Sequence, residues 1–92
     1  MAEDVEIRRK RLLYRATHRG FREADLLIGG FAKTHLDNMS EAELNEFEAL
    51  LGVSDHDLYA WATGAGEPPA NLAGPVFDRL RAFDVASLVA PS

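Results

Sequence analysis

The stretch that decides the fold covers residues 39–52 and has the sequence MSEAELNEFEALLG. Ser40 is a preferred helix N-cap, and Glu43 three residues later completes a capping box. Met39 before the cap and Leu44 after it have the spacing of a hydrophobic staple. Leucine and phenylalanine then recur at helical intervals until a glycine ends the pattern. The stretch therefore predicts an α-helix whose start and end are both marked in the sequence.

Helical spacing of apolar residues continues on both sides of this stretch, and no alternating strand pattern extends beyond a few residues. One helix is expected from about Val5 to His18, and a second begins at Phe21. A short helix is expected between Ser54, its N-cap, and Gly64. Residues 64–75, rich in Gly, Pro and Ala, predict a surface loop. Pro75 then opens the last helix, at a position where its missing N–H has no cost.

The predicted fold class is therefore all-α, a compact five-helix bundle. Its 92 residues, 47% of them apolar, predict a single domain over residues 1–92, with a core at about 5–85 and flexible ends. Gly29 and Gly30 lie inside the second predicted helix, where each costs about 1 kcal/mol relative to alanine. We expect another helix to approach closely at that point.

Charge is distributed unevenly along the chain. Residues 1–22 carry 7 basic and 3 acidic residues, a net of +4, while residues 23–92 carry 3 and 12, a net of −9, which together give −5. The acidic body argues against broad nucleic-acid binding, which usually needs a basic domain. The acids of the helix after Ser40 are expected to form a solvated face; they are Glu41, Glu43, Glu46 and Glu48.

Several chemistries have no support in the sequence. The chain contains no cysteine, which excludes disulfides, zinc–thiolate sites and a cysteine nucleophile. No catalytic triad, phosphate loop or dinucleotide fingerprint is present, and the three histidines lack metal-ligand spacing. We therefore expect no enzymatic activity and no metal site. No secretory signal and no apolar run of about 20 residues is apparent, so a cytoplasmic protein without a membrane span is expected.

The charged turn Arg19-Gly20-Phe21-Arg22-Glu23 lies between the first two predicted helices. Glycine at such a junction tolerates positive φ, and charged side chains beside a tight turn are expected on the surface. Two interpretations stay open for Arg19, Gly20 and Glu23. They form a local turn held by an Arg–Glu pair at i, i+4, or a polar knob that inserts into a cleft of another protein.

The basic segment before this turn has three interpretations: a solvated helix face, a nucleic-acid contact, or an interface with an acidic protein patch. Arg8, Arg11 and Arg15 share one face of the first predicted helix. The four neighbouring residues 8–11 cannot all point one way, so at most two or three of them share a face.

These motifs together resemble the succinate dehydrogenase assembly factors that promote covalent flavin attachment, known as SdhE in bacteria. The family's RGxxE signature is present as residues 19–23, after a basic lead-in at 8–15. Further similarity lies in residues 26–29, 31–32, 40–51 and 57–61, so that the resemblance covers about residues 7–83.

The resemblance implies a five-helix protein that binds the flavoprotein subunit of succinate dehydrogenase, or of fumarate reductase. There it would promote bonding of a partner histidine to the flavin. The expected partner-binding residues are Arg19, Gly20, Glu23, Arg22, Arg15, Arg11 and Arg8. We expect no tightly bound cofactor in this chain, which would act on FAD held by the partner, and a monomer when it is free.

The alternative is a generic helical interaction module, regulatory or linked to nucleic acid, that uses the basic surface at residues 8–22. Salt dependence separates the two, because a protein with several phosphate contacts loses affinity steeply as salt rises.

Overall fold

The computed structural model describes residues 4–83 and contains, in that part of the chain, helices but no strand. The helices are α1 (Val5–Thr17), α2 (Arg22–His35), α3 (Glu41–Leu51), α4 (Asp55–Ala62) and α5 (Pro75–Ala82), and a 3-10 turn, η1 (Leu36–Asn38), joins α2 to α3. The predicted all-α class is confirmed, although η1 was not predicted. None of these helices combines the length and apolar character that a bilayer span requires. The predicted flexible ends lie outside the described residues.

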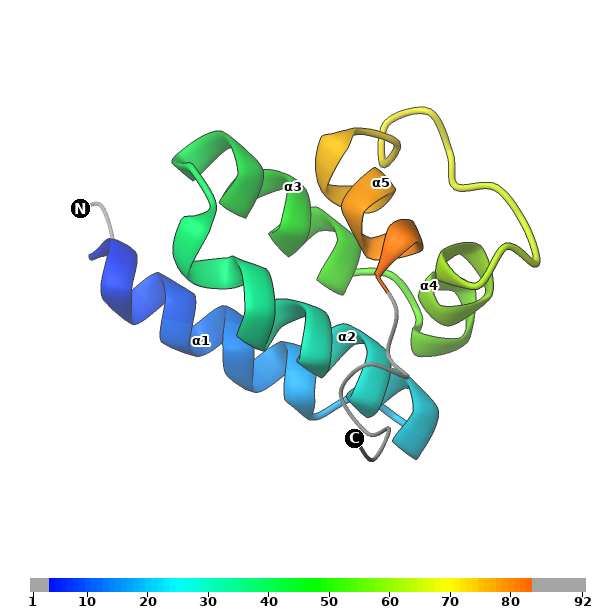
Figure 1. Ribbon diagram of the computed structural model, residues 1–92, viewed down its shortest axis with the longest axis horizontal. Helices are drawn as coiled ribbons and strands as arrows, with labels where there is room; N and C mark the ends of the chain where they lie inside the picture. The colour runs from blue at the N-terminus through cyan, green and yellow to red at the C-terminus, as the bar shows by residue number, and fades with distance from the viewer. Residues whose placement is uncertain (1–3, 84–92) are drawn as a thin grey trace, which may run out of the picture.

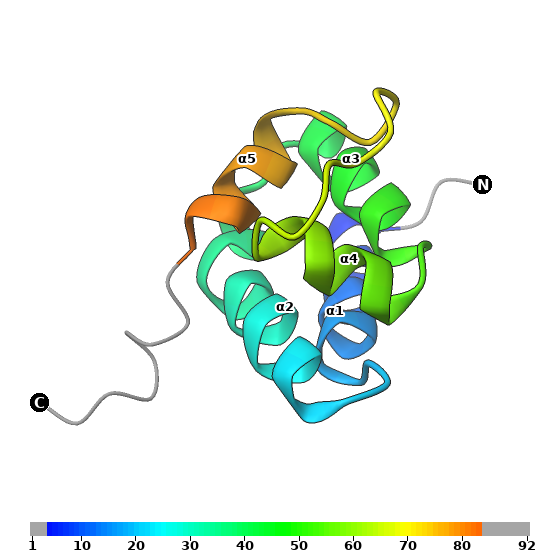
Figure 2. The same cartoon turned by 90° about the vertical axis from the view of Figure 1, so that its right-hand side faces the viewer.

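The helices form a compact bundle around one core (Figure 1). α1 and α2 run side by side as a pair, and α3 packs on α1 and on α5. Seen from the side in Figure 2, α4 lies between the pair and the loop that leads to α5; it contacts α2, α3 and α5. The turn between α1 and α2 comes close to the start of α4, which decides the geometry of the candidate site.

Every helix contributes buried apolar side chains to the core. Phe31 of α2 and Phe47 of α3 are fully buried, with ring centroids 5.8 Å apart, and Phe83 meets Phe31 edge-on at 5.8 Å. The other buried side chains are Leu12, Ala16, Ala24, Leu27, Ile28, Ala32, Leu36, Met39, Leu44, Leu50, Leu51, Leu58, Ala62, Val76, Phe77 and Leu80.

The predicted capping signals are confirmed. Ser40 Oγ accepts the N–H of Glu43 at 3.2 Å, and the Glu43 carboxylate accepts the N–H of Ser40 at 2.9 Å, which completes the capping box of α3. Ser54 Oγ accepts the N–H of Asp57 at 3.2 Å and caps α4. Pro75 occupies the first turn of α5. Local sequence signals thus define where three of the helices begin.

Gly29, inside α2, lies against the end of α1. A Cβ added at Gly29 would lie 3.0 Å from Thr17 Cγ2 and 3.3 Å from the carbonyl oxygen of Ala16. The predicted close approach of a second helix is therefore confirmed at Gly29. This close packing at Gly29 holds the end of α1 against α2 and so fixes the turn between the two helices.

Candidate functional site

The guanidinium of Arg19 points into the protein and clamps the α1–α2 turn to the junction of α3 and α4. Its side chain is 5% exposed. Nη1 donates to the carbonyl of Leu51 at 3.0 Å, and Nη2 donates to the carbonyl of Val53 at 3.1 Å and lies 2.6 Å from Asp55 Oδ1. Carbonyls at a helix C-terminus lack partners within the helix, and Arg19 supplies donors to them. The backbone N–H of Arg19 is also held, because it donates to the Asp25 carboxylate.

One prediction for Arg19 is therefore wrong, and one of the two open interpretations of the turn is excluded. Its charge is not displayed on the surface, and its ion-pair partner is Asp55, not Glu23. The expectation was that charged side chains beside a tight turn lie on the surface, and arginine is indeed rarely buried unless it is paired. Here the pair exists, but it is formed with a residue 36 positions away, which local spacing does not reveal.

Gly20 leaves the space that the Asp55 carboxylate occupies in the same clamp. A Cβ at this position would collide with Oδ2 of Asp55. The predicted reason, a positive φ, is wrong: Gly64, with φ of 88°, has the positive φ among the described glycines, and Gly20 does not. Gly20 is exposed, so its backbone faces outward while the absent side chain leaves room for Asp55.

Phe21 adds an aromatic contact between the turn and α4. Its ring stacks on His56 at 4.7 Å between centroids and 14° between planes, and it meets Tyr59 edge-on at 5.3 Å. Pairs of this kind contribute about 0.5–1.5 kcal/mol beyond the area they bury. The turn is thus held on one side by the ion pair of buried Arg19 with the partly exposed Asp55, and on the other by stacked rings.

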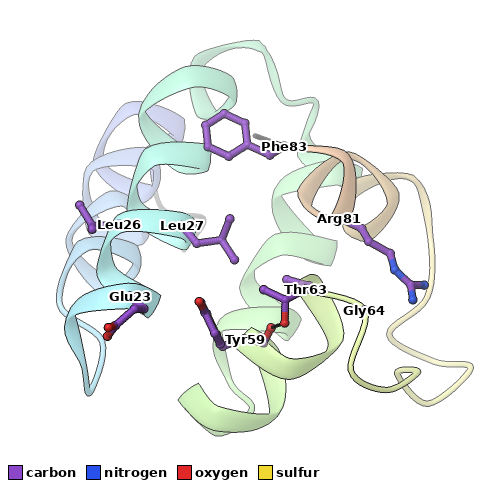
Figure 3. A pocket seen from close by; sticks show the side chains of 9 residues that line it. Glu23, Leu26, Leu27, Tyr59, Thr63, Gly64, Arg81 and Phe83 are labelled. Carbon is purple, nitrogen blue, oxygen red and sulfur yellow. Dashed lines mark hydrogen bonds between the residues drawn. The ribbon is translucent and has the colours of Figure 1, made fainter. Parts of the chain in front are cut away.

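Arg22 and Glu23 are exposed, as predicted. Neither side chain forms an ion pair or hydrogen bond with any residue of the described range 4–83. Glu23 lies at the edge of a groove of about 570 Å³ between α2, α4 and the end of α5 (Figure 3). Across this groove from α2 lie Tyr59 of α4 and Thr63, the residue that follows α4.

The basic face of α1 meets α3 at one carboxylate. Arg8 Nη2 lies 2.8 Å from Glu48 Oε1 and 2.6 Å from the Asn45 side-chain oxygen. Arg11 Nη1 lies 3.3 Å, and Arg15 Nη1 3.8 Å, from Glu48 Oε2. Hydrogen bonding from Arg8 is the main cause that holds the pKa of the Glu48 carboxyl below its ordinary value. The three arginines therefore share a face, as predicted, and that face stabilises the contact of α1 with α3.

Arg9 lies on the other side of α1. It donates to the carbonyls of Leu36 at 3.2 Å and Met39 at 3.0 Å, and it pairs with Glu6 at 2.7 Å. The prediction that the basic run divides between faces is confirmed. Much of the positive charge near the N-terminus is thus already engaged within the chain.

The solvated face predicted for the acids of α3 is wrong for three of them. Besides Glu48, Glu43 pairs with Arg79 at 2.7 Å, and the Glu46 carboxylate accepts the N–H of Val76 at 3.2 Å. The hydrogen bond from the backbone of Ser40, followed by that from Arg79, lowers the pKa of Glu43. Glu46 and Glu48 are distinguished from solvated acids only by partners distant in sequence, on α5 and α1, whereas Glu43 also has a local partner in Ser40.

Asp55 and Glu48 organise the site, and the sequence did not predict either role. Asp55 follows the N-cap Ser54, where an acid is already explained by the helix dipole, so nothing local marked it as the partner of Arg19. Among the described residues, no group of three His, Cys, Asp or Glu side chains could hold a metal ion. His18 instead stacks on Tyr14, with centroids 4.0 Å apart.

Comparison with known proteins identifies the family. The family model described as "Flavinator of succinate dehydrogenase" matches residues 10–84. The protein named "Succinate dehydrogenase assembly factor 2, mitochondrial" of Scheffersomyces stipitis is 49% identical over 61 residues, which cover 66% of this chain and 41% of that protein. Its namesake in Danio rerio is 40% identical over 83 residues, 88% of this chain and 52% of that protein.

The chain spans about half the length of these curated relatives. The matched range nevertheless includes the clamped turn, the groove and most of the basic face of α1. The chain belongs to the family of flavinators of succinate dehydrogenase.

Proposed function

We propose that this chain is an assembly factor that binds the flavoprotein subunit of succinate dehydrogenase and promotes covalent attachment of FAD to a histidine of that subunit. Family membership and the names of the relatives support this role. The flavoprotein subunit of fumarate reductase, in which FAD would be attached to a histidine in the same way, is a second candidate partner.

The observation that carries the proposal is the division of roles within residues 19–23. Arg19 is buried and holds the turn in place, whereas Gly20, Arg22 and Glu23 are exposed on it. A fixed turn loses little conformational entropy when it docks, so its exposed polar groups are suited to bind another protein. Glu23 then contacts the partner directly, and Arg19 acts by positioning the turn.

The chain's contribution to flavin attachment is positional. Holding the flavin and the attachment histidine of the partner in a reactive geometry lowers the barrier without a nucleophile from this chain. We infer that the chain itself is not a catalyst and that FAD stays on the partner throughout. Arg8, Arg11 and Arg15, which are partly exposed beside Glu48, add electrostatic steering toward an acidic partner surface.

Covalent flavin provides the test. The flavoprotein subunit of succinate dehydrogenase, or that of fumarate reductase, is expressed in cells lacking their own assembly factor, with this chain or a variant. In-gel flavin fluorescence then measures covalent FAD. Glu23→Lys should reduce the signal several-fold, whereas Glu41→Lys, at another exposed acid without a partner among residues 4–83, should not. Equal fluorescence with and without the wild-type chain would contradict the proposal.

Gly20→Arg should abolish flavin attachment as well, but this substitution needs a stability control. Because even a Cβ at Gly20 collides with Asp55, the larger side chain disturbs the clamp as well as the docking surface. Circular dichroism of the purified variant separates loss of the fold from loss of docking.

The alternative role, a nucleic-acid-linked or regulatory module, is less well supported. Most of its basic surface is engaged internally: Arg19 is buried against Asp55, Arg9 binds backbone carbonyls, and Arg8 pairs with Glu48. The cytoplasmic location stays a prediction, since the named relatives are mitochondrial proteins.

A further inference from the structure

The groove beside Glu23 has apolar walls and is large enough to take side chains of another molecule. Its volume is about 570 Å³, within the range of about 300–1,000 Å³ that is typical of ligand pockets. Leu27 lines it from α2, Ala62 from α4, and Phe83 from the end of α5. Leu26, which is 39% exposed, lies at its outer edge. Apolar surface left uncovered beside a fixed turn favours contact with a partner.

The groove has a charged residue at each end, and only one of the two is paired within the described residues. Arg81 at one end is bound by the Glu67 carboxylate at 3.0 and 3.2 Å and lies 5.9 Å from the ring centroid of Phe77. Glu23 at the other end has no ion-pair partner among residues 4–83. The uncompensated charge of the groove is therefore negative, and an occupant that supplies a cation fits it best.

We propose that this groove receives an apolar side chain of the flavoprotein subunit that lies next to a lysine or arginine, and that this cation pairs with Glu23. The proposal rests on the proposed function for the identity of the partner. A buried apolar anchor supplies most of the binding free energy at such sites, and the ion pair fixes its orientation. Glu23 is only three residues from Gly20, so one partner surface covers both the turn and the groove.

Filling the groove tests the apolar part. Thr63 is exposed and lines the groove, and its hydroxyl donates to the carbonyl of Tyr59 at 2.8 Å. Thr34 is a matched control, exposed on α2 away from the groove with the same kind of bond, to Gly30 at 2.9 Å. Thr63→Trp should weaken binding of the purified flavoprotein subunit at least about tenfold, the effect of losing one hot-spot contact. Thr34→Trp should leave the affinity unchanged, and equal affinities for both variants would overturn the proposal.

Removing the charge tests the ion pair. Glu23→Gln should raise the dissociation constant and flatten its dependence on salt, because one screened attraction is lost. Glu41→Gln should change neither quantity. A Glu23→Gln variant with the salt dependence of the wild type would exclude a cation at this position in the complex.

The occupant itself is identified by a photo-crosslinking residue at position 26. Crosslinks to a flavoprotein peptide in which an apolar residue adjoins Lys or Arg support the proposal. Crosslinks within the same chain to residues 84–92, which follow Phe83, or to a second copy would overturn it. If the wild-type chain fails to bind the flavoprotein or to promote flavin attachment, the proposed function itself is wrong. If both succeed while Thr63→Trp binds normally, only the groove proposal is wrong.

Discussion

Replacing Asp55 by alanine should lower the free energy of unfolding far more than the same replacement of an exposed acid in that helix turn. Arg19 is 5% exposed, and its guanidinium lies 2.6 Å from Asp55 Oδ1, whose side chain is 27% exposed. Asp55→Ala leaves a buried cation with two backbone carbonyls as its remaining acceptors. Breaking a fully buried pair costs about 3–5 kcal/mol; because Asp55 is partly solvated, we expect about 2–3 kcal/mol here.

The matched control is Asp57→Ala. Asp57 also lies in the first turn of α4, but it is exposed, and its side chain has no ion pair among residues 4–83. Both substitutions remove the same favourable interaction with the helix dipole, about 0.3–1 kcal/mol. The difference between the two variants therefore isolates the interaction of Asp55 with Arg19.

Arg19→Met should cost less than Asp55→Ala, about 1–2 kcal/mol, for a specific reason. Nε of Arg19 is buried without a hydrogen-bond partner, so removal of the guanidinium also removes that unfavourable contribution. In the double variant the two losses should not add, and a coupling of about 1–2 kcal/mol is expected for groups in direct contact.

Urea unfolding followed by Trp61 fluorescence and by circular dichroism measures these differences, because Trp61 lies on α4. For a domain of this size, a loss of 2–3 kcal/mol lowers the melting temperature by about 10–20 °C. Surface substitutions typically change the free energy of unfolding by no more than about 0.5 kcal/mol. If the losses caused by Asp55→Ala and Asp57→Ala differ by less than this, the Arg19–Asp55 pair does not clamp the turn.

Two further predictions concern Gly20 in the clamp and Glu48 at the contact of α1 with α3. Gly20→Ala should lower the free energy of unfolding by about 1 kcal/mol, because its Cβ forces the Asp55 carboxylate to move. Urea unfolding measures this loss. The control is Gly66→Ala, which should change the free energy of unfolding little because its Cβ would make an ordinary contact. Equal losses for the two variants would contradict the steric argument. Because the pKa of Glu48 is lowered in the folded state, its stabilisation is present above the ordinary glutamate pKa, about 4.3, and is lost as pH falls through the lower folded value. Glu48→Gln should reduce the loss of stability in that acidic interval, measured by urea unfolding at each pH, while Glu41→Gln should not.

The fold was predictable because its signals are local. A capping box joins Ser40 to Glu43 only three residues apart, and Pro75 marks the start of α5 by its own covalent structure. Gly29 also gave a usable signal, since glycine inside a helix is unfavourable without compensation by packing. Such features depend on neighbours in sequence or on a single residue's intrinsic cost.

The candidate site was predictable only in part, because its organisation is non-local. The turn and its exposed Glu23 followed from residue types, but the burial of Arg19 depends on Asp55, which lies 36 positions further along the chain. The same is true of Glu46, which satisfies an N–H at the start of α5. An acid in a helix has the same local pattern whether it faces solvent or a neighbouring element, so pairing of this kind becomes visible only with the fold.

The structure places three residues of a five-residue motif in different environments, and this changes how their variants must be interpreted. Under the proposed function, Arg19 acts through stability and the position of the turn, Gly20 through the space it leaves for Asp55, and Glu23 through an exposed carboxylate. All three substitutions should lower covalent flavin on a partner, so that assay alone cannot distinguish them. Only the substitution of Glu23 should do so at unchanged stability of the free domain. A Glu23 variant that unfolds as readily as Arg19→Met would show that the carboxylate belongs to the clamp, and the docking surface would then have to lie elsewhere.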